Sequence, residues 1–190
     1  MINNKLFAGV DEVGRGCLAG PVVSAVVILK KTAILDNIKD SKKLNFNLRL
    51  KIADHIKKHS FYSIGTASVE EIYKINILQA SLLSMKRALD KMSKKPKLVL
   101  IDGIFAPKGI KNFKVIIKGD MKFKCIAAAS IIAKVYRDNL MIKLAKKFKN
   151  YHWHKNFGYG TLEHLEGIKK YGVTKHHRKG FSPIHKMLFR

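Results

Sequence analysis

The segment KLVLID at residues 97–102 constrains the fold most strongly, because its apolar residues run continuously instead of alternating with polar ones. A strand of this kind is buried on both faces, so its sheet needs a layer of helices on each side. Residues 21–29, PVVSAVVIL, are rich in β-branched side chains and predict a second buried strand. The chain is therefore expected to adopt a layered α/β fold.

Periodicity predicts the other elements. Three further strands are expected at residues 5–10, 61–68 and 113–118. Apolar residues that recur every three or four positions predict helices at 46–59, 69–92, 124–148 and 161–171. The 69–92 helix is expected to bury one stripe, made of Ile72, Ile75, Leu78, Leu82, Met85 and Leu89.

A length of 190 residues suits a single domain, residues 1–190, with a substantial core. The order of the elements predicts a mixed five-stranded sheet flanked by helices over about residues 1–150. Residues from about 151 to 190 are aromatic, His-rich and basic, and a C-terminal helical extension is expected there.

Charge is strongly unbalanced, with 38 Lys and Arg against 13 Asp and Glu, a formal net charge of +25. Such a surface attracts a polyanion, nucleic acid first and a membrane surface second. The same excess of lysine also arises from an AT-rich genome, so charge alone does not establish nucleic-acid binding. No apolar run approaches the ~20 residues that span a bilayer, and no membrane association is expected. No signal peptide is expected, and Cys17 and Cys125 are expected to be free thiols in the cytoplasm.

Four of the scarce acids follow strands. Asp11 and Glu12 close the first expected strand, Asp102 closes the 97–102 strand, and Asp120 follows the 113–118 strand. Carboxylates beside buried strands are costly unless a cation compensates them, and Mg²⁺ prefers such oxygen ligands. A cluster of carboxylates can hold two metals about 4 Å apart, as in nucleases. Neighbouring residues of a regular strand point to opposite faces, so Asp11 and Glu12 share a site only if the strand ends or distorts there. For any one acid, a plain turn role stays open.

Gly14-Arg15-Gly16 follows the first acid pair. Glycines lack Cβ atoms and let the backbone approach a ligand closely, while the Arg15 fork suits a phosphate. A tight turn between two strands is the alternative reading of these three residues.

With these motifs, the chain resembles ribonuclease HII, the bacterial type 2 ribonuclease H. The resemblance is carried by AGVDEVGRGCLAGPVV (8–23), DSKKL (40–44), LIDG (100–103), KGD (118–120), IAAASIIAKVYRD (126–138), FGYGT (157–161) and HRKGF (177–181). It implies a ribonuclease H-like sheet with a substrate-binding C-terminal extension. It also implies metal-dependent hydrolysis of RNA in RNA–DNA hybrids and cutting 5′ to single ribonucleotides in duplex DNA, leaving 5′-phosphate and 3′-hydroxyl ends.

The resemblance also assigns site residues. Asp11, Glu12, Asp102 and Asp120 match the catalytic acids, which hold Mn²⁺ or Mg²⁺, two ions during catalysis. Gly14, Arg15 and Gly16 match the motif that contacts the junction between ribo- and deoxyribonucleotides, and Tyr159 matches a tyrosine that packs on the sugar. Lys42, Lys43 and Lys122 are further candidates for phosphate contacts, and solvated lysines remain the alternative. The tail reads HHRKGF where the family usually has HRRSF, which leaves the role of residues 177–181 open.

Two other functions remain open at this stage. A non-enzymatic basic nucleic-acid-binding protein would explain the charge but not the four acids. Ribonuclease HIII shares the fold but usually carries an extra N-terminal domain, for which no room is expected before the first strand. The expected partners are RNA–DNA hybrid and duplex DNA with embedded ribonucleotides. A sliding clamp could bind the C-terminal tail FSPIHKMLFR, and a monomer is expected.

Overall fold

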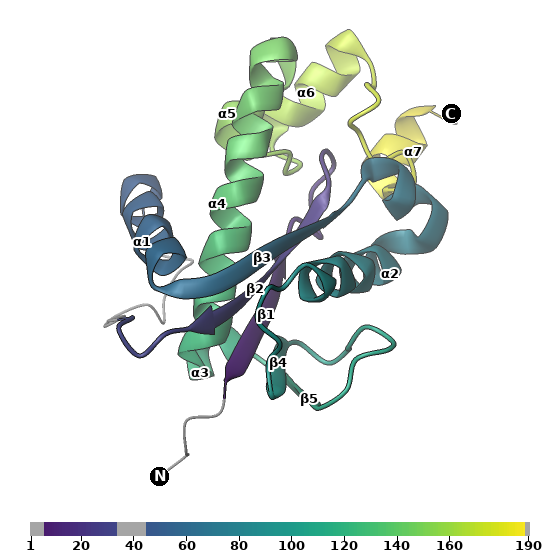
Figure 1. Cartoon of the computed structure of the whole chain (residues 1–190). Coiled ribbons are helices and arrows are strands. Elements are labelled where there is room, and N and C mark those ends of the chain that lie inside the picture. The colour runs from purple at the N-terminus through teal and green to yellow at the C-terminus, as the bar shows by residue number, and fades with distance from the viewer. Residues whose placement is uncertain (1–5, 34–44, 189–190) are drawn as a thin grey trace.

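The computed structural model describes residues 6–33 and 45–188 (Figure 1). Its five-stranded sheet has the order β3-β2-β1-β4-β5. The strands are β1 (Phe7–Val13), β2 (Val22–Leu29), β3 (Ser60–Ala67), β4 (Leu98–Asp102) and β5 (Phe113–Ile116). β2 pairs antiparallel with both β1 and β3, whereas β4 pairs parallel with both β1 and β5. The expected mixed sheet is therefore confirmed.

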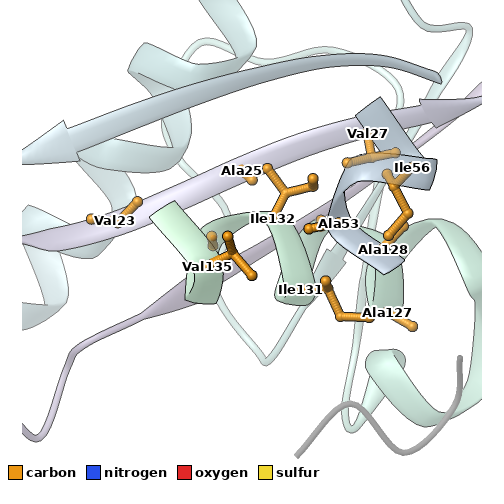
Figure 2. Close-up of a cluster of buried hydrophobic side chains, with 12 residues drawn as sticks. Val23, Ala25, Val27, Ala53, Ile56, Ala127, Ala128, Ile131, Ile132 and Val135 are labelled. Carbon is orange, nitrogen blue, oxygen red and sulfur yellow. The ribbon is translucent and has the colours of Figure 1, made fainter. Parts of the chain in front are cut away.

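Helices cover both faces of the sheet, as the continuous apolar strands predicted (Figure 1). Helices α1 (Phe46–Lys58) and α4 (Lys124–Lys147) pack on one face, and α2 (Val69–Asp90) packs on the other. Successive residues of β2 serve the two layers alternately: Val27 packs toward α1 and α4 (Figure 2), and Val26 packs toward α2. This alternation explains why β2 has no polar face.

Helix α4 lies very close to β1. A Cβ atom on Gly9 would come within 2.1 Å of the Cys125 carbonyl carbon, so only glycine fits at this position. Small side chains follow in this part of the helix, Ala127, Ala128 and Ala129, all of which are buried. The close approach brings the first turns of α4 against the strand that carries Asp11.

Two expected elements differ in detail. β1 does not end near residue 10, because Glu12 and Val13 still pair with Ser24 and Val23 of β2. Helix α2 is interrupted at Asn76, whose φ is 65° and whose Oδ1 accepts a hydrogen bond from the Gln79 N–H at 3.1 Å. The stripe expected along one continuous helix is wrong at Ile75, which is exposed and lies directly before this break.

The chain after α4 forms a 3-10 turn (Lys149–Tyr151), α5 (Trp153–Asn156), α6 (Leu162–Tyr171) and α7 (Ser182–Leu188). These elements pack around Trp153 and Ile184, which also contact Leu18 and Ala19 of the loop between β1 and β2. The expected helix at 161–171 is thereby confirmed. None of the helices in the two described ranges is long and apolar enough to cross a membrane.

Candidate active site

The register of the two central parallel strands places the acids. Val10 of β1 lies opposite Ile101 of β4, so the next residues along, Asp11 and Asp102, come side by side. β4 ends at Asp102, whereas β1 continues to Val13. Past Asp102, the β4 side of β1 is therefore open, and a pocket forms at this opening. Asp11, Glu12 and Asp102 all line it.

Asp11 and Glu12 reach this pocket from opposite faces of the sheet. Asp11 lies in the pocket with Ser130 of α4, whose side chain lowers the Asp11 pKa, whereas Glu12 also lines a second groove beside Leu82 and Met85 on the α2 side. β1 stays paired with β2 as far as Val13 and ends there, directly after Glu12, so the strand ends where a shared site needs it to end. Both carboxylates line the pocket at this end of the strand, together with Asp102.

The carboxylates disfavour one another's charge. Burial raises the pKa of Asp11 well above its ordinary value, and the neighbouring charges of Glu12 and Asp102 raise it further. Burial also raises the pKa of Glu12, while Arg15 opposes this shift. Arg15 Nη1 lies 3.2 Å from Glu12 Oε1, and half of the Arg15 side chain is exposed. The pocket therefore concentrates negative groups, and Arg15 partly compensates the charge of Glu12.

Asp120 lies on a different element. It belongs to the short helix α3 (Gly119–Lys122) and is buried, but it is not among the residues that line the pocket. The residue before it, Gly119, donates its N–H to Asp102 Oδ1 at 2.6 Å. This bond ties the beginning of α3 to the end of β4, so Asp120 is next in sequence to a direct partner of Asp102.

The donor set suits a hard divalent cation such as Mg²⁺ or Mn²⁺, because it consists of carboxylates and because burial disfavours the charge of Asp11 and Glu12. Within residues 6–33 and 45–188, however, no three His, Cys, Asp or Glu side chains already surround a single point. Some of their oxygens are engaged elsewhere, Glu12 with Arg15 and Asp102 with Gly119. The residues fit such an ion in type, and an ion would compete with Arg15 for Glu12.

The loop of residues 14–16 forms one wall of the same pocket. Gly14 has a φ of 93°, and a Cβ there would lie 2.2 Å from Arg137 Nε, so its lack of a side chain is required inside the protein. Gly16 differs, because a Cβ there would meet nothing within 4 Å. Only Gly16 thus presents bare backbone to open space.

Tyr159 completes the pocket from the C-terminal extension, and 41% of it is exposed. His164 Nδ1 donates to the Tyr159 carbonyl at 2.8 Å, which holds the tyrosine backbone from below. Of the candidate lysines, Lys122 lies exposed on α3 and does not line the pocket. Lys42 and Lys43 lie outside the described residues.

Two further cations, Arg49 and Lys134, line the pocket. Lys134 Nζ lies 2.8 Å from Asp138 Oδ1, and Arg49 Nη1 lies 3.6 Å from Asp138 Oδ2. The sequence itself indicates the place of Lys134, because Ser130 and Lys134 are four residues apart on one helix and so face the same side, and both line the pocket. Arg49 gave no such signal, because it comes from α1, on a distant part of the chain.

Known proteins share this architecture. A family model described as Ribonuclease HII matches residues 8–190. A ribonuclease HII of Pelagibacter ubique (strain HTCC1062) is 56% identical over 186 residues, which cover 97% of this chain and 100% of that protein. The structure of ribonuclease H2 from Pyrococcus horikoshii OT3 matches with a TM-score of 0.79 and 27% identity, over 95% of this chain and 96% of that one. A PCNA:RNase HII complex from Archaeoglobus fulgidus contains a chain that matches with a TM-score of 0.71 and 25% identity, over 93% and 95%.

Proposed function

Because this chain belongs to the ribonuclease HII family and is a ribonuclease H, we propose that it cuts the RNA strand of RNA–DNA hybrids and cuts 5′ to a single ribonucleotide in duplex DNA. The observation that carries the proposal is one shared pocket. Asp11, Glu12 and Asp102 line it together with the 14–16 loop and Tyr159. Groups suited to phosphodiester hydrolysis thus lie directly beside groups suited to contact a sugar.

For the chemistry, we propose that Asp11, Glu12, Asp102 and Asp120 hold two Mg²⁺ or Mn²⁺ ions. Such ions supply an activated water and stabilise the attacking and leaving oxygens of an in-line displacement, which leaves 5′-phosphate and 3′-hydroxyl ends. The protein's part is to hold its carboxylates ionised and fixed. Gly119 fixes one oxygen of Asp102, and the Ser130 side chain opposes the rise of the Asp11 pKa.

For recognition, we propose that the backbone of Gly14-Arg15-Gly16 contacts the junction sugar and that Tyr159 packs on the sugar beside the cut. The exposure of Gly16 and Tyr159 on the pocket wall supports these roles. Arg15 is proposed to contact a phosphate once Glu12 no longer holds it. Lys42, Lys43 and Lys122 are proposed as outer phosphate contacts, and the net charge of +25 gives the field that attracts the duplex.

Other features of the proposal concern partners and location. The relative from Archaeoglobus fulgidus is found in a complex with PCNA, and we propose that the C-terminal tail of this chain also binds a sliding clamp. Met187 and Leu188 are exposed at the end of α7, where a partner could cover them.

The helices after α4 are proposed as a substrate-binding extension of a single domain. We propose a monomer in the cytoplasm, where free Cys17 and Cys125 suit the reducing conditions.

Family membership decides against the two other functions that the sequence left open. A non-enzymatic basic binder does not account for a ribonuclease H family match over residues 8–190. The match is also to ribonuclease HII rather than to ribonuclease HIII.

The test uses a labelled DNA duplex with one ribonucleotide, together with an all-DNA duplex and an RNA–DNA hybrid. We expect Mg²⁺-dependent cutting 5′ to the ribonucleotide, no cutting in EDTA and none of all-DNA. D102N should lower the rate by at least ~10³-fold, because it removes charge from the proposed metal site. The matched control is D54N, which removes an exposed carboxylate of α1 and should cut normally. Binding without cutting under every metal condition would refute the proposed activity.

A further inference from the structure

Arg178 is a buried guanidinium that faces the back of the 14–16 loop, and only 1% of the residue is exposed. Its Nη2 donates to the Gly14 carbonyl at 2.6 Å, its Nη1 to the Arg15 carbonyl at 2.8 Å, and its Nε to the Gly20 carbonyl at 2.9 Å. Burial lowers the pKa of this guanidinium to about 10, so it stays charged at neutral pH. Across the described part of the chain, no carboxylate forms an ion pair with Arg178.

The backbone fixes Arg178 in this place. The Arg178 N–H donates to the Leu18 carbonyl at 2.8 Å, and the Gly20 N–H donates to the His176 carbonyl at 2.9 Å. Ala19 and His177 form a β-bridge between these two bonds. The start of the HRKGF motif thus pairs directly with the end of the loop that carries Gly14, Arg15 and Gly16. The side chain and the main chain of Arg178 both bind one loop.

The hydrogen bonds from Arg178 to the Gly14 and Arg15 carbonyls also fix the direction of two N–H groups in the loop. The Gly14 carbonyl belongs to the same peptide unit as the Arg15 N–H, and the Arg15 carbonyl belongs to the same unit as the Gly16 N–H. In a trans peptide the N–H points away from the C=O, so each bond to Arg178 turns an N–H outward. A charged donor on a carbonyl also polarises the amide and strengthens its N–H as a donor.

These two N–H groups are left for a ligand. Among backbone bonds of the described residues, neither the Arg15 N–H nor the Gly16 N–H has a carbonyl acceptor. Both residues are exposed and line the pocket of the acids. Backbone donors in this position suit the oxygens of a sugar–phosphate chain.

We propose that Arg178 is a positioning residue for substrate recognition: it fixes the 14–16 loop so that the Arg15 and Gly16 N–H groups donate to the ribose and phosphate oxygens of the ribonucleotide. This inference rests on the proposed function and extends it to a residue of the C-terminal extension. Arg178 itself does not touch substrate. It acts through two peptide groups, so its loss should reduce selectivity for ribonucleotides more than it reduces general attraction to DNA.

The test measures binding in EDTA, without cutting, to two duplexes that differ only in one ribonucleotide. We expect R178K to lower the ratio of the two affinities about tenfold, because one ammonium cannot reach three separate carbonyls. The matched control is R87K. Arg87 donates to the Thr66 carbonyl and to the Glu71 carboxylate, away from the 14–16 loop, so this variant should keep the ratio.

A second measurement needs no variant. The ¹⁵N-detected amide signals of Arg15 and Gly16 in the unmodified protein should shift when the ribonucleotide duplex binds and stay in place with all-DNA. If the parent discriminates, but R178K keeps the full ratio or these two amides do not respond, the role of Arg178 is refuted and the proposed function stands. If the parent itself does not distinguish the duplexes, the proposed substrate and this inference both fail.

Discussion

Acidification should destabilise the fold through a buried histidine pair in the C-terminal extension. Trp153 Nε1 donates to His164 Nε2 at 2.9 Å, so this nitrogen carries no proton, and His164 Nδ1 donates to the Tyr159 carbonyl. The Thr174 N–H donates to His177 Nδ1 at 2.9 Å, which leaves His177 Nε2 to donate to His164 Nε2 at 3.1 Å. Every ring nitrogen is satisfied only while both rings are neutral.

The size of the effect follows from the pKa of His177, which burial and the neighbouring His164 lower from 6.5 to about 4. A histidine with a lowered pKa binds fewer protons in the folded than in the unfolded state at intermediate pH. The free energy of unfolding therefore falls as the pH drops from about 6.5 toward 4. Between pH 7 and pH 5 the loss from His177 is about 2 kcal/mol. Burial also lowers the pKa of His164, so its contribution has the same sign.

The assay is urea unfolding at pH 7, 6 and 5, followed by tryptophan fluorescence. Trp153 is the only tryptophan in the sequence and is hydrogen-bonded to His164, so its fluorescence reports on the surroundings of the histidine pair. H177Q should remove most of the pH dependence, whereas H154Q, which replaces an exposed histidine of the same extension, should keep it. A parent protein whose stability is constant from pH 7 to pH 5, or an H177Q variant with the parent's pH dependence, would refute the reasoning.

Two further predictions concern backbone space and thiol reactivity. G14A should lower the free energy of unfolding by about 2–4 kcal/mol, because Gly14 has a φ of 93° and a Cβ there would collide with Arg137. G16A should change the free energy of unfolding by no more than about 1 kcal/mol, because a Cβ there meets nothing. Urea unfolding of both variants measures the difference, and equal losses would contradict this prediction. Burial raises the pKa of the Cys125 thiol to about 11 from 9.0, so at pH 8 iodoacetamide should alkylate it about a hundredfold more slowly than an ordinary thiol, and labelling at the normal rate would show that the site opens.

Local patterns explain why most of the fold could be predicted. The five strands are short apolar runs, and helices α1, α4 and α6 match their predicted ranges closely, because burial on one or two faces leaves a period in the sequence. The break in α2 left no such trace. Asn76 lies outside the expected apolar stripe, where a polar residue is ordinary in a helix. The break depends instead on a local hydrogen bond, in which Asn76 Oδ1 accepts from the Gln79 N–H. The end of β1 was placed too early because polar residues within a strand resemble its end.

The acids of the pocket could be predicted as a group but not as an arrangement. Asp11 and Asp102 lie side by side because β1 and β4 pair in one particular register, which the sequence does not specify. The sequence also does not show that β1 extends beyond the end of β4.

Arg178 shows the limit more clearly, because its two bonds to the 14–16 loop join residues 163 and 164 positions apart. No period or short motif encodes a contact between a side chain and distant carbonyls, since any backbone offers carbonyls. The glycines were read as making room for a sugar, yet Gly14 makes room for Arg137. The bare surface of this loop is therefore held from behind by arginines, and its affinity for substrate should depend on residues that the substrate never reaches.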